Sequence, residues 1–190
     1  MSGRSELPPI PEPERPYWLD AFLAAPARTV PLIFLRHAAA VSKEAWREAG
    51  NTSDQPRPLS GPGLAQSRAL AQILASYQPA QVVSSATERC LATIRPYAAL
   101  TGASTETEPA FSVGNGSAGQ ARQRIGDIAA CEKPVIVCAH RENLPLLVEG
   151  ACEQLGVPPW QGPPLYPGGF VVLHVAAGRL VAAEQHQASP

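Results

Sequence analysis

The chain has no excess of charge of either sign and little charge altogether. Lysine and arginine number 15 and aspartate and glutamate number 16, which leaves a net charge of −1. Charged residues make up 16% of the 190 residues, below the usual value of about 25%. A protein that binds nucleic acid through its general surface needs a basic balance, so the composition excludes that class. The composition does not exclude a local positive pocket.

The chain also lacks an apolar run of the roughly 18 residues that a membrane span requires. The nearest approach, residues 17–35, is interrupted by Asp20, Arg28 and two prolines. A signal peptide would carry Asp20 in its apolar centre, which argues against that interpretation as well. We therefore expect a cytoplasmic protein with no membrane partner.

The four cysteines form no CxxC pair and show no metal-type spacing with histidine. A redox or zinc site would need such spacing. Small buried hydrophobic side chains in a reducing compartment are the favoured alternative. We expect no metal and no cofactor.

Proline is concentrated near the N-terminus, where residues 1–30 are predicted to form an extended arm with a short helix over 17–25. Residues 31–184 have the length of one ordinary domain. Residues 185–190 are expected to be a polar tail. A second proline-rich stretch, 158–168, is predicted to be a rigid loop packed on its own domain. A proline-rich ligand for a partner's groove is the alternative.

Strand and helix patterns alternate between these proline-rich segments. Short runs rich in β-branched and aromatic residues are typical of strands buried on both faces of a parallel sheet. These runs are 31–36, 81–84, 135–139 and 170–175, with 178–183 as an edge strand. The predicted helices cover 63–77, 87–100, 117–130 and 143–156. The alternation predicts an α/β three-layer sandwich, with a mainly parallel central sheet and helices on both faces.

Cationic side chains and histidines follow three of the predicted strands where each strand ends. Arg36 ends the first strand and His37 follows it, Arg89 lies near the start of the helix predicted after the second strand, and His140 and Arg141 follow the third strand. Ligands of open α/β sheets bind at the carboxyl ends of the strands. We therefore expect these side chains to form one site.

These residue types together suit phosphoryl transfer. A neutral imidazole can attack phosphorus near neutral pH, because its ordinary pKa is about 6.5. Such an attack forms a covalent phosphohistidine and divides one difficult displacement into two easier ones. Guanidinium groups bind phosphate oxygens in bidentate fashion and stabilise the charge of the transition state. This chemistry requires no metal.

The same segments resemble those of a known family. Leu35-Arg36-His37-Ala38 resembles the Arg-His-Gly/Ala motif of the histidine phosphatase superfamily, and His140-Arg141 resembles its "HRxxLP" segment. Arg57-Pro58-Leu59-Ser60, and Ser84-Ser85 with Arg89, are similar to two further segments of its small bacterial branch. Together the segments are most similar to the phosphatase domain fused to Nudix in bacterial MutT-like hydrolases, and next to the small phosphohistidine phosphatases.

The resemblance implies a phosphoglycerate mutase-like fold and a role for each matched residue. It makes His37 the nucleophile, Arg36 and Arg89 the phosphate clamps, and His140 the second imidazole at the transferred group. Arg141 has two alternative interpretations: its side chain contacts phosphate or substrate, or it is solvated. No metal or cofactor is implied.

The sequence departs from the family pattern at the catalytic acid. Val113 stands where the family usually has a glutamate. Glu106 and Glu108, just upstream, are the predicted substitutes, and Glu44 and Glu142 are further candidates. A placed acid typically contributes 10²–10⁴-fold when an alcohol leaves. Its absence favours substrates with better leaving groups.

The predicted function is a metal-independent phosphatase that hydrolyses a phosphomonoester or a phosphohistidine or pyrophosphate-type substrate through His37. Its expected partners are a phosphorylated small molecule, a nucleotide or a phosphohistidine protein. The alternative is a catalytically weak phosphate- or nucleotide-binding member of the fold that acts with a partner. A mutase is a third interpretation. Some relatives form dimers, which leaves a homodimer open, and the sequence does not identify the physiological substrate.

Overall fold

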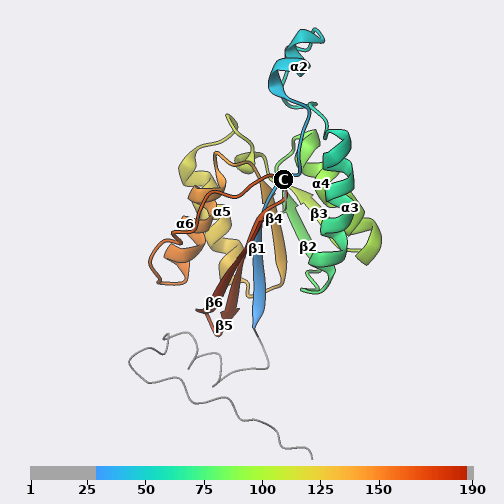
Figure 1. The fold of residues 1–190 in the computed structure, drawn as a ribbon. Coiled ribbons are helices and arrows are strands. Elements are labelled where there is room, and N and C mark those ends of the chain that lie inside the picture. The colour runs from blue at the N-terminus through green and yellow to red at the C-terminus, as the bar shows by residue number, and fades with distance from the viewer. Residues whose placement is uncertain (1–28, 188–190) are drawn as a thin grey trace, which may run out of the picture.

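A six-stranded sheet forms the centre of the computed structural model, which describes residues 29–187 (Figure 1). The predicted N-terminal arm, apart from its last two residues, and the helix predicted over 17–25 lie outside the described residues. The strands are β1 (Val30–Arg36), β2 (Gln81–Ser84), β3 (Ser104–Thr107), β4 (Val135–Ala139), β5 (Phe170–Ala176) and β6 (Arg179–His186). The helices are α2 (Lys43–Glu48), α3 (Gly61–Ala75), α4 (Glu88–Thr101), α5 (Ala118–Ala130) and α6 (Leu144–Gln154), with a 3₁₀ turn, η2, at Pro109–Phe111.

The strand order is β3-β2-β4-β1-β5-β6. The first four strands of this order run parallel, as predicted, whereas β5 pairs with β1 in the antiparallel sense. The prediction of β5 as a further parallel strand is therefore wrong in direction. The reason is that the loop after α6 returns to the carboxyl end of β1, where Arg36 N donates to Gly169 O at 2.9 Å. β5 then begins at the end of the sheet where β1 finishes.

The sequence patterns did not predict strand β3 or helix α2. β3 is polar and exposed along its length, so it lacks the apolar run that identifies a buried strand. Helix α2 has no buried residue and projects beyond the sheet (Figure 1). β6 is also longer than predicted, because its pairing continues to Phe170 opposite His186. Gln185 and His186, which were predicted to lie in the polar tail, therefore belong to β6.

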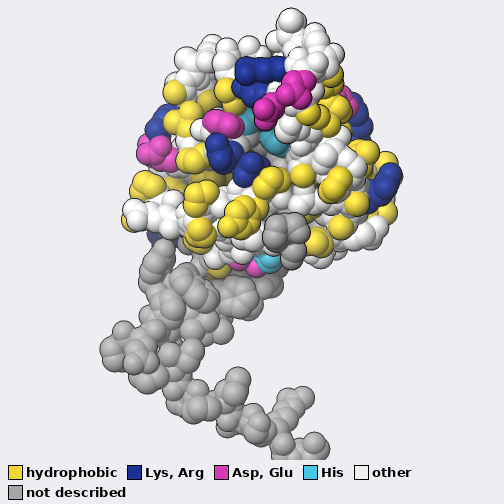
Figure 2. Space-filling view, turned by 45° about the horizontal axis from the view of Figure 1, so that its top comes forward, with side chains coloured by type: hydrophobic (Ala, Val, Ile, Leu, Met, Phe, Trp, Pro, Cys, Tyr) yellow, Lys and Arg dark blue, Asp and Glu magenta, His cyan; other side chains and the backbone are white. Residues whose placement is uncertain are grey.

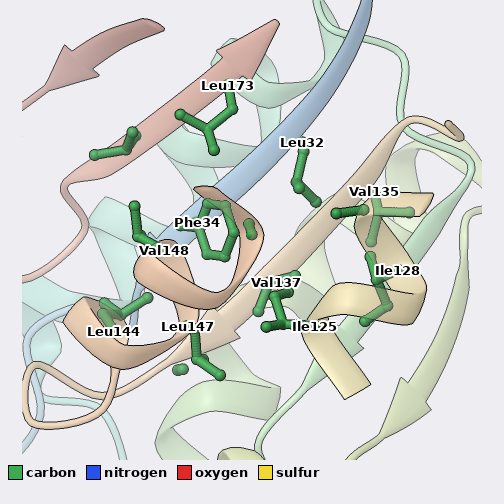
Figure 3. Packing of buried hydrophobic residues seen from close by; sticks show 14 of the residues in the cluster. Leu32, Phe34, Ile125, Ile128, Val135, Val137, Leu144, Leu147, Val148 and Leu173 are labelled. Carbon is green, nitrogen blue, oxygen red and sulfur yellow. The ribbon is translucent and has the colours of Figure 1, made fainter. Parts of the chain in front are cut away.

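The sheet separates two hydrophobic clusters, one under each pair of helices. On β1, Leu32 and Phe34 point toward α5 and α6, whereas Ile33 and Leu35 point toward α3 and α4. This alternation follows from the two-residue period of a strand. Figure 3 shows Phe34 packed close to Val148 of α6 in the first cluster. The three-layer architecture confirms the predicted fold class.

The proline-rich loop over 158–168 packs on its own domain, as predicted. Pro167 O accepts a hydrogen bond from Gln66 Nε2 at 2.8 Å, and Leu165 O accepts one from Arg36 Nη1 at 2.6 Å. These contacts hold the loop against α3 and against the end of β1. The loop thereby becomes one wall of the region above the sheet.

Three of the four cysteines are buried, as expected, but Cys131 at the end of α5 is exposed.

None of the helices in residues 29–187 is long and apolar enough to cross a membrane.

Candidate active site

His37 lies immediately after β1, and the residue is 9% exposed. Its amide donates to Ala139 O at 3.1 Å, which joins the ends of β1 and β4. Its Nδ1 lies 2.8 Å from Ala38 O. A carbonyl oxygen can only accept a hydrogen bond, so Nδ1 carries the proton. The lone pair of the neutral ring is therefore on Nε2.

Burial lowers the pKa of His37 from 6.5 to about 4, and the neighbouring His140 and Arg89 act in the same direction. The imidazole is consequently neutral at neutral pH. A neutral ring with a fixed tautomer is the form that can attack an electrophile through Nε2.

Two arginines flank this histidine. Arg36 ends β1 and donates through Nη1 to Leu165 O, while Arg89 starts the first turn of α4 and is 5% exposed. The Nε atoms of both arginines are buried without a hydrogen-bond partner among the described residues. Burial also lowers the pKa of both guanidinium groups. Buried donors of this kind are normally satisfied, so the two Nε groups fit an anion that is bound between them.

His140 follows β4 and is 1% exposed. Its Nε2 lies 2.9 Å from Ser85 Oγ and 3.4 Å from Thr87 Oγ1. Its ring makes an edge-on contact with His37, with 5.3 Å between the ring centroids. Asn143 Oδ1 accepts a hydrogen bond from its amide at 3.0 Å. The second imidazole is thus held firmly beside the first.

A cleft of about 370 Å³ opens above these side chains. The four residues predicted as catalytic, Arg36, His37, Arg89 and His140, all line it, and so does the exposed Arg141. Figure 2 shows histidine side chains in a hollow with Lys, Arg, Asp and Glu side chains around it. The structure therefore brings together the groups that the sequence places at three separate strand ends.

The cleft is also lined by three charged residues that were not predicted to belong to the site. Asp54 Oδ1 accepts from Arg57 Nε at 2.7 Å, and Asp54 Oδ2 lies 3.0 Å from Arg89 Nη2. Lys43 of α2 is the third. Arg57 belongs to the motif Arg57-Pro58-Leu59-Ser60 and could have been found from it. Asp54 lies in an irregular loop segment with no signal in the sequence.

The predicted acids do not reach this cleft. Glu106 and Glu108 instead form ion pairs with Arg124, at 2.6 Å and 3.3 Å, and neither lines the cleft. Both were chosen by their position in the sequence, but β3 and η2 direct them toward α5. Among the further candidates, Glu44 is absent from the lining and Glu142 is part of it.

In the described part of the chain, the two carboxyl groups that line the cleft are Asp54 and Glu142. Burial tends to raise the pKa of Asp54, but the hydrogen bond from Arg57 and the charge of Arg89 outweigh it, so the pKa is lowered. Burial also opposes the shift at Glu142, where its own backbone amide and Arg141 lower the pKa. Both side chains are therefore ionised at neutral pH. Neither holds a proton ready for a leaving group.

Comparisons with known proteins agree with the fold and with the motifs. Residues 32–112 match the family model of the histidine phosphatase superfamily (branch 1). The chain is 27% identical over 168 residues to an 8-oxo-(d)GTP phosphatase of Mycolicibacterium smegmatis, a match that covers 87% of this chain and 51% of the relative. The chain thus spans about half the length of this curated relative.

Two solved structures illustrate the likeness of fold. A mycobacterial glucosyl-3-phosphoglycerate phosphatase in complex with VO3 superimposes with a TM-score of 0.59 at 18% identity, over 84% of this chain and all of the other. The protein histidine phosphatase SixA in complex with tungstate gives a TM-score of 0.58 at 19% identity, over 83% of this chain and 94% of the other. These likenesses show the fold, and residues 32–112 resemble the histidine phosphatase superfamily (branch 1).

Proposed function

We propose that the protein is a phosphatase that acts through a covalent phosphohistidine on His37. The observation that carries the proposal is the state of this side chain: neutral, with its proton on Nδ1 and its Nε2 lone pair free, at a cleft with two arginines whose Nε atoms are buried. The match of residues 32–112 to the family model and the named relative support phosphatase activity in general. The residue roles below rest on the resemblance and the geometry.

The first step is an attack of His37 Nε2 on phosphorus. The N–P bond forms, the bond from phosphorus to the leaving group breaks, and the leaving group departs with the bonding electrons. Arg36, Arg89 and His140 hold the equatorial oxygens, where negative charge spreads in the transition state. The carbonyl of Ala38 stabilises the positive charge on the phosphorylated ring through Nδ1–H. Water then attacks phosphorus, and phosphate and the free imidazole are released.

Substrates with good leaving groups suit this cleft best. Both carboxyl groups in its lining are ionised, and Val113 occupies a position on its wall without an ionisable side chain. An alkoxide therefore leaves without a proton donor. A phosphate or a neutral imidazole needs far less help, because the second pKa of phosphate is about 6. We propose phosphohistidine, phosphoanhydride or aryl phosphate substrates in preference to alkyl esters.

The named relatives are compatible with several phosphorylated substrates. The curated relative acts, by its name, on 8-oxo-(d)GTP, and one structural neighbour is named as a protein histidine phosphatase. A nucleotide and a phosphohistidine protein are accordingly both retained as candidates. The similarity to a Nudix-fused phosphatase stays a prediction.

Turnover of p-nitrophenyl phosphate, measured with EDTA present, tests the proposal. We expect activity in the wild type and a loss of at least about 10³-fold in His37→Ala, in line with the loss of a nucleophile. Trapping of radiolabelled phosphate on the wild type and not on the variant would identify the intermediate. Equal, negligible rates in both proteins would contradict the proposal and favour the alternative, a protein that binds phosphate without cleaving it.

A further inference from the structure

A second cavity of about 290 Å³ lies between α6 and the proline-rich loop. Its walls are mostly apolar and include Leu144 and Val148 from α6, and Trp160, Pro164 and Leu165 from the loop. Rigid proline rings and an indole offer flat apolar surfaces on which a planar ring can lie. The described structure leaves this space open, although the residues around it pack tightly on the sheet.

This cavity adjoins the catalytic cleft. Arg141 lines both of them. Leu165, in the wall of the cavity, accepts the hydrogen bond of Arg36, in the wall of the cleft, at 2.6 Å. A molecule whose phosphate lies at His37 can therefore extend past Arg141 into the cavity.

The charges along this path are those of a binding site for a second anionic group. Among residues 29–187, Glu149 is the one carboxylate in the lining of the cavity, and it is paired with Arg122 at 2.7 Å. Arg141 is exposed between the two spaces, and no ion pair to it is found among the described residues. Its guanidinium group can thus bind a phosphate that links the reacting phosphoryl group to an apolar group.

We infer that the cavity between α6 and the loop holds a planar aromatic group at the far end of a phosphoanhydride, with Arg141 on the second phosphate. The inference rests on the proposed function and specifies the substrate of that same site. In the reaction, the N–P bond to His37 forms, the P–O bond of the anhydride breaks, and the bridging oxygen leaves with its electron pair on the second phosphate. That phosphate needs no proton donor, which agrees with the ionised state of Asp54 and Glu142 in the lining of the cleft.

Binding measurements on the full-length His37→Ala protein separate this inference from the question of turnover. ADP serves as the aromatic probe, and pyrophosphate and inorganic phosphate serve as probes without a ring, all by isothermal titration calorimetry. We expect ADP to bind at least tenfold more tightly than pyrophosphate. Val148→Phe, which fills the cavity, should remove this difference. Arg141→Ala should weaken ADP and pyrophosphate severalfold and inorganic phosphate much less.

Two matched controls fix the interpretation. Val157→Phe adds the same ring on the far side of Trp160, and Arg179→Ala removes an exposed arginine on β6. Neither should change the three affinities. If Val148→Phe does not fold, as judged by thermal unfolding, Arg141→Ala still tests the path. Equal affinities for ADP and pyrophosphate in the parent protein would overturn the inference, whereas inactivity of the wild type on every phosphate would contradict the proposed function alone.

Discussion

The carboxylate of Asp54 lies 3.0 Å from Arg89, one of the two arginines placed to bind phosphate. Arg89 also donates through Nη1 to the backbone carbonyl of Asp54 at 2.8 Å. Both terminal nitrogens of this guanidinium group are therefore directed at the same residue, and only its Nε lacks a partner among the described residues. A bound phosphate shares Arg89 with Asp54 or displaces it.

We predict that Asp54→Asn binds inorganic phosphate more tightly than the wild type. Asparagine has a single side-chain oxygen, so the substitution keeps an acceptor for only one of Arg57 and Arg89, and it removes a negative charge from the lining of the cleft. An ion pair that is partly exposed to solvent contributes about 0.2–1 kcal/mol, so the dissociation constant should fall roughly two- to fivefold. Isothermal titration calorimetry with phosphate measures this change.

Asp127→Asn is the matched control, because Asp127 lies on α5 and its side chain accepts from Gln123 only, away from the cleft. Its phosphate affinity should equal that of the wild type. Weaker phosphate binding by Asp54→Asn would mean that Asp54 mainly positions Arg89 and does not compete with the anion.

A pH titration of His37 should give a midpoint near 4 in the folded protein. Burial is the main cause of this low pKa. Nuclear magnetic resonance of the ring Cε1–H measures the midpoint, and the same titration in urea should return it to about 6.5. A midpoint of 6 or above in the folded protein would show that the ring is solvated and would remove the argument for a permanently neutral nucleophile.

The same pKa links folding stability to pH. Between pH 6.5 and 4 the unfolded chain binds a proton at His37 and the folded chain does not, so the free energy of unfolding falls as the pH falls through this range. The difference between the two pKa values corresponds to about 3 kcal/mol when the protein is fully acidified. Denaturant unfolding of His37→Gln should show a correspondingly smaller dependence on pH. An unchanged dependence would assign the acid sensitivity to other groups.

The part of the site that follows buried strands could be predicted from the sequence. Arg36, His37 and His140 come directly after apolar runs, and the carboxyl ends of parallel strands meet at one edge, so their proximity follows from the pattern alone. Asp54 could not be found in this way. It lies in an irregular segment before α3, and only the packing of that segment against α4 brings it to Arg89.

The predictions that Glu106 is the acid and that β5 runs parallel to β1 failed for the same reason. Both depend on how separate segments are placed in space. Glu106 was close in sequence to the expected acid, but strand β3 fixes its direction toward Arg124. The apolar run of β5 indicates a strand, but its direction is set by the loop that returns to Gly168 and Gly169 at the end of β1. Local patterns contain no information on such long-range placement.

Ser85→Ala should reduce kcat by about tenfold on p-nitrophenyl phosphate, with a smaller change in KM. The Ser85 hydroxyl lies 2.9 Å from His140 Nε2 and 2.8 Å from Ser112 Oγ, so it fixes the orientation of the second imidazole. A hydrogen bond of this kind contributes about 1 kcal/mol, and tenfold corresponds to about 1.4 kcal/mol. Ser104→Ala, on the exposed strand β3, should leave both constants unchanged. A Ser85→Ala variant with the kcat of the wild type would show that His140 is held by other contacts.

Val113→Glu should increase kcat/KM on an alkyl phosphate such as glycerol phosphate at about pH 5, where an exposed glutamate with an ordinary pKa of about 4.3 is still partly protonated. Val113 lines the cleft and is 53% exposed, so the longer side chain can reach the leaving-group side without entering the core. We expect a gain of at least about tenfold, below the 10²–10⁴-fold of a well-placed acid. The rate on p-nitrophenyl phosphate should change little, because its leaving group needs no proton. Val113→Gln, which has nearly the same shape but cannot donate a proton in this way, should show no gain on either substrate, and a gain with glutamine would refute the acid argument.

Gly63→Ala should destabilise the protein and distort the segment that follows His37. Gly63 lies in the first turn of α3, where its amide donates to Ser60 Oγ at 3.2 Å, and Ser60 in turn donates to Ala39 O. A methyl group on Gly63 would overlap the Ala39 carbonyl, which is backbone and cannot swing aside. Overpacking of this kind typically costs about 1–3 kcal/mol, measurable by denaturant unfolding. Gly61→Ala adds the same methyl group two residues earlier, where nothing lies within 4 Å, and should be neutral or slightly stabilising. Equal stabilities of the two variants would show that α3 can move away from the catalytic loop without loss, and that the close approach at Gly63 does not position His37.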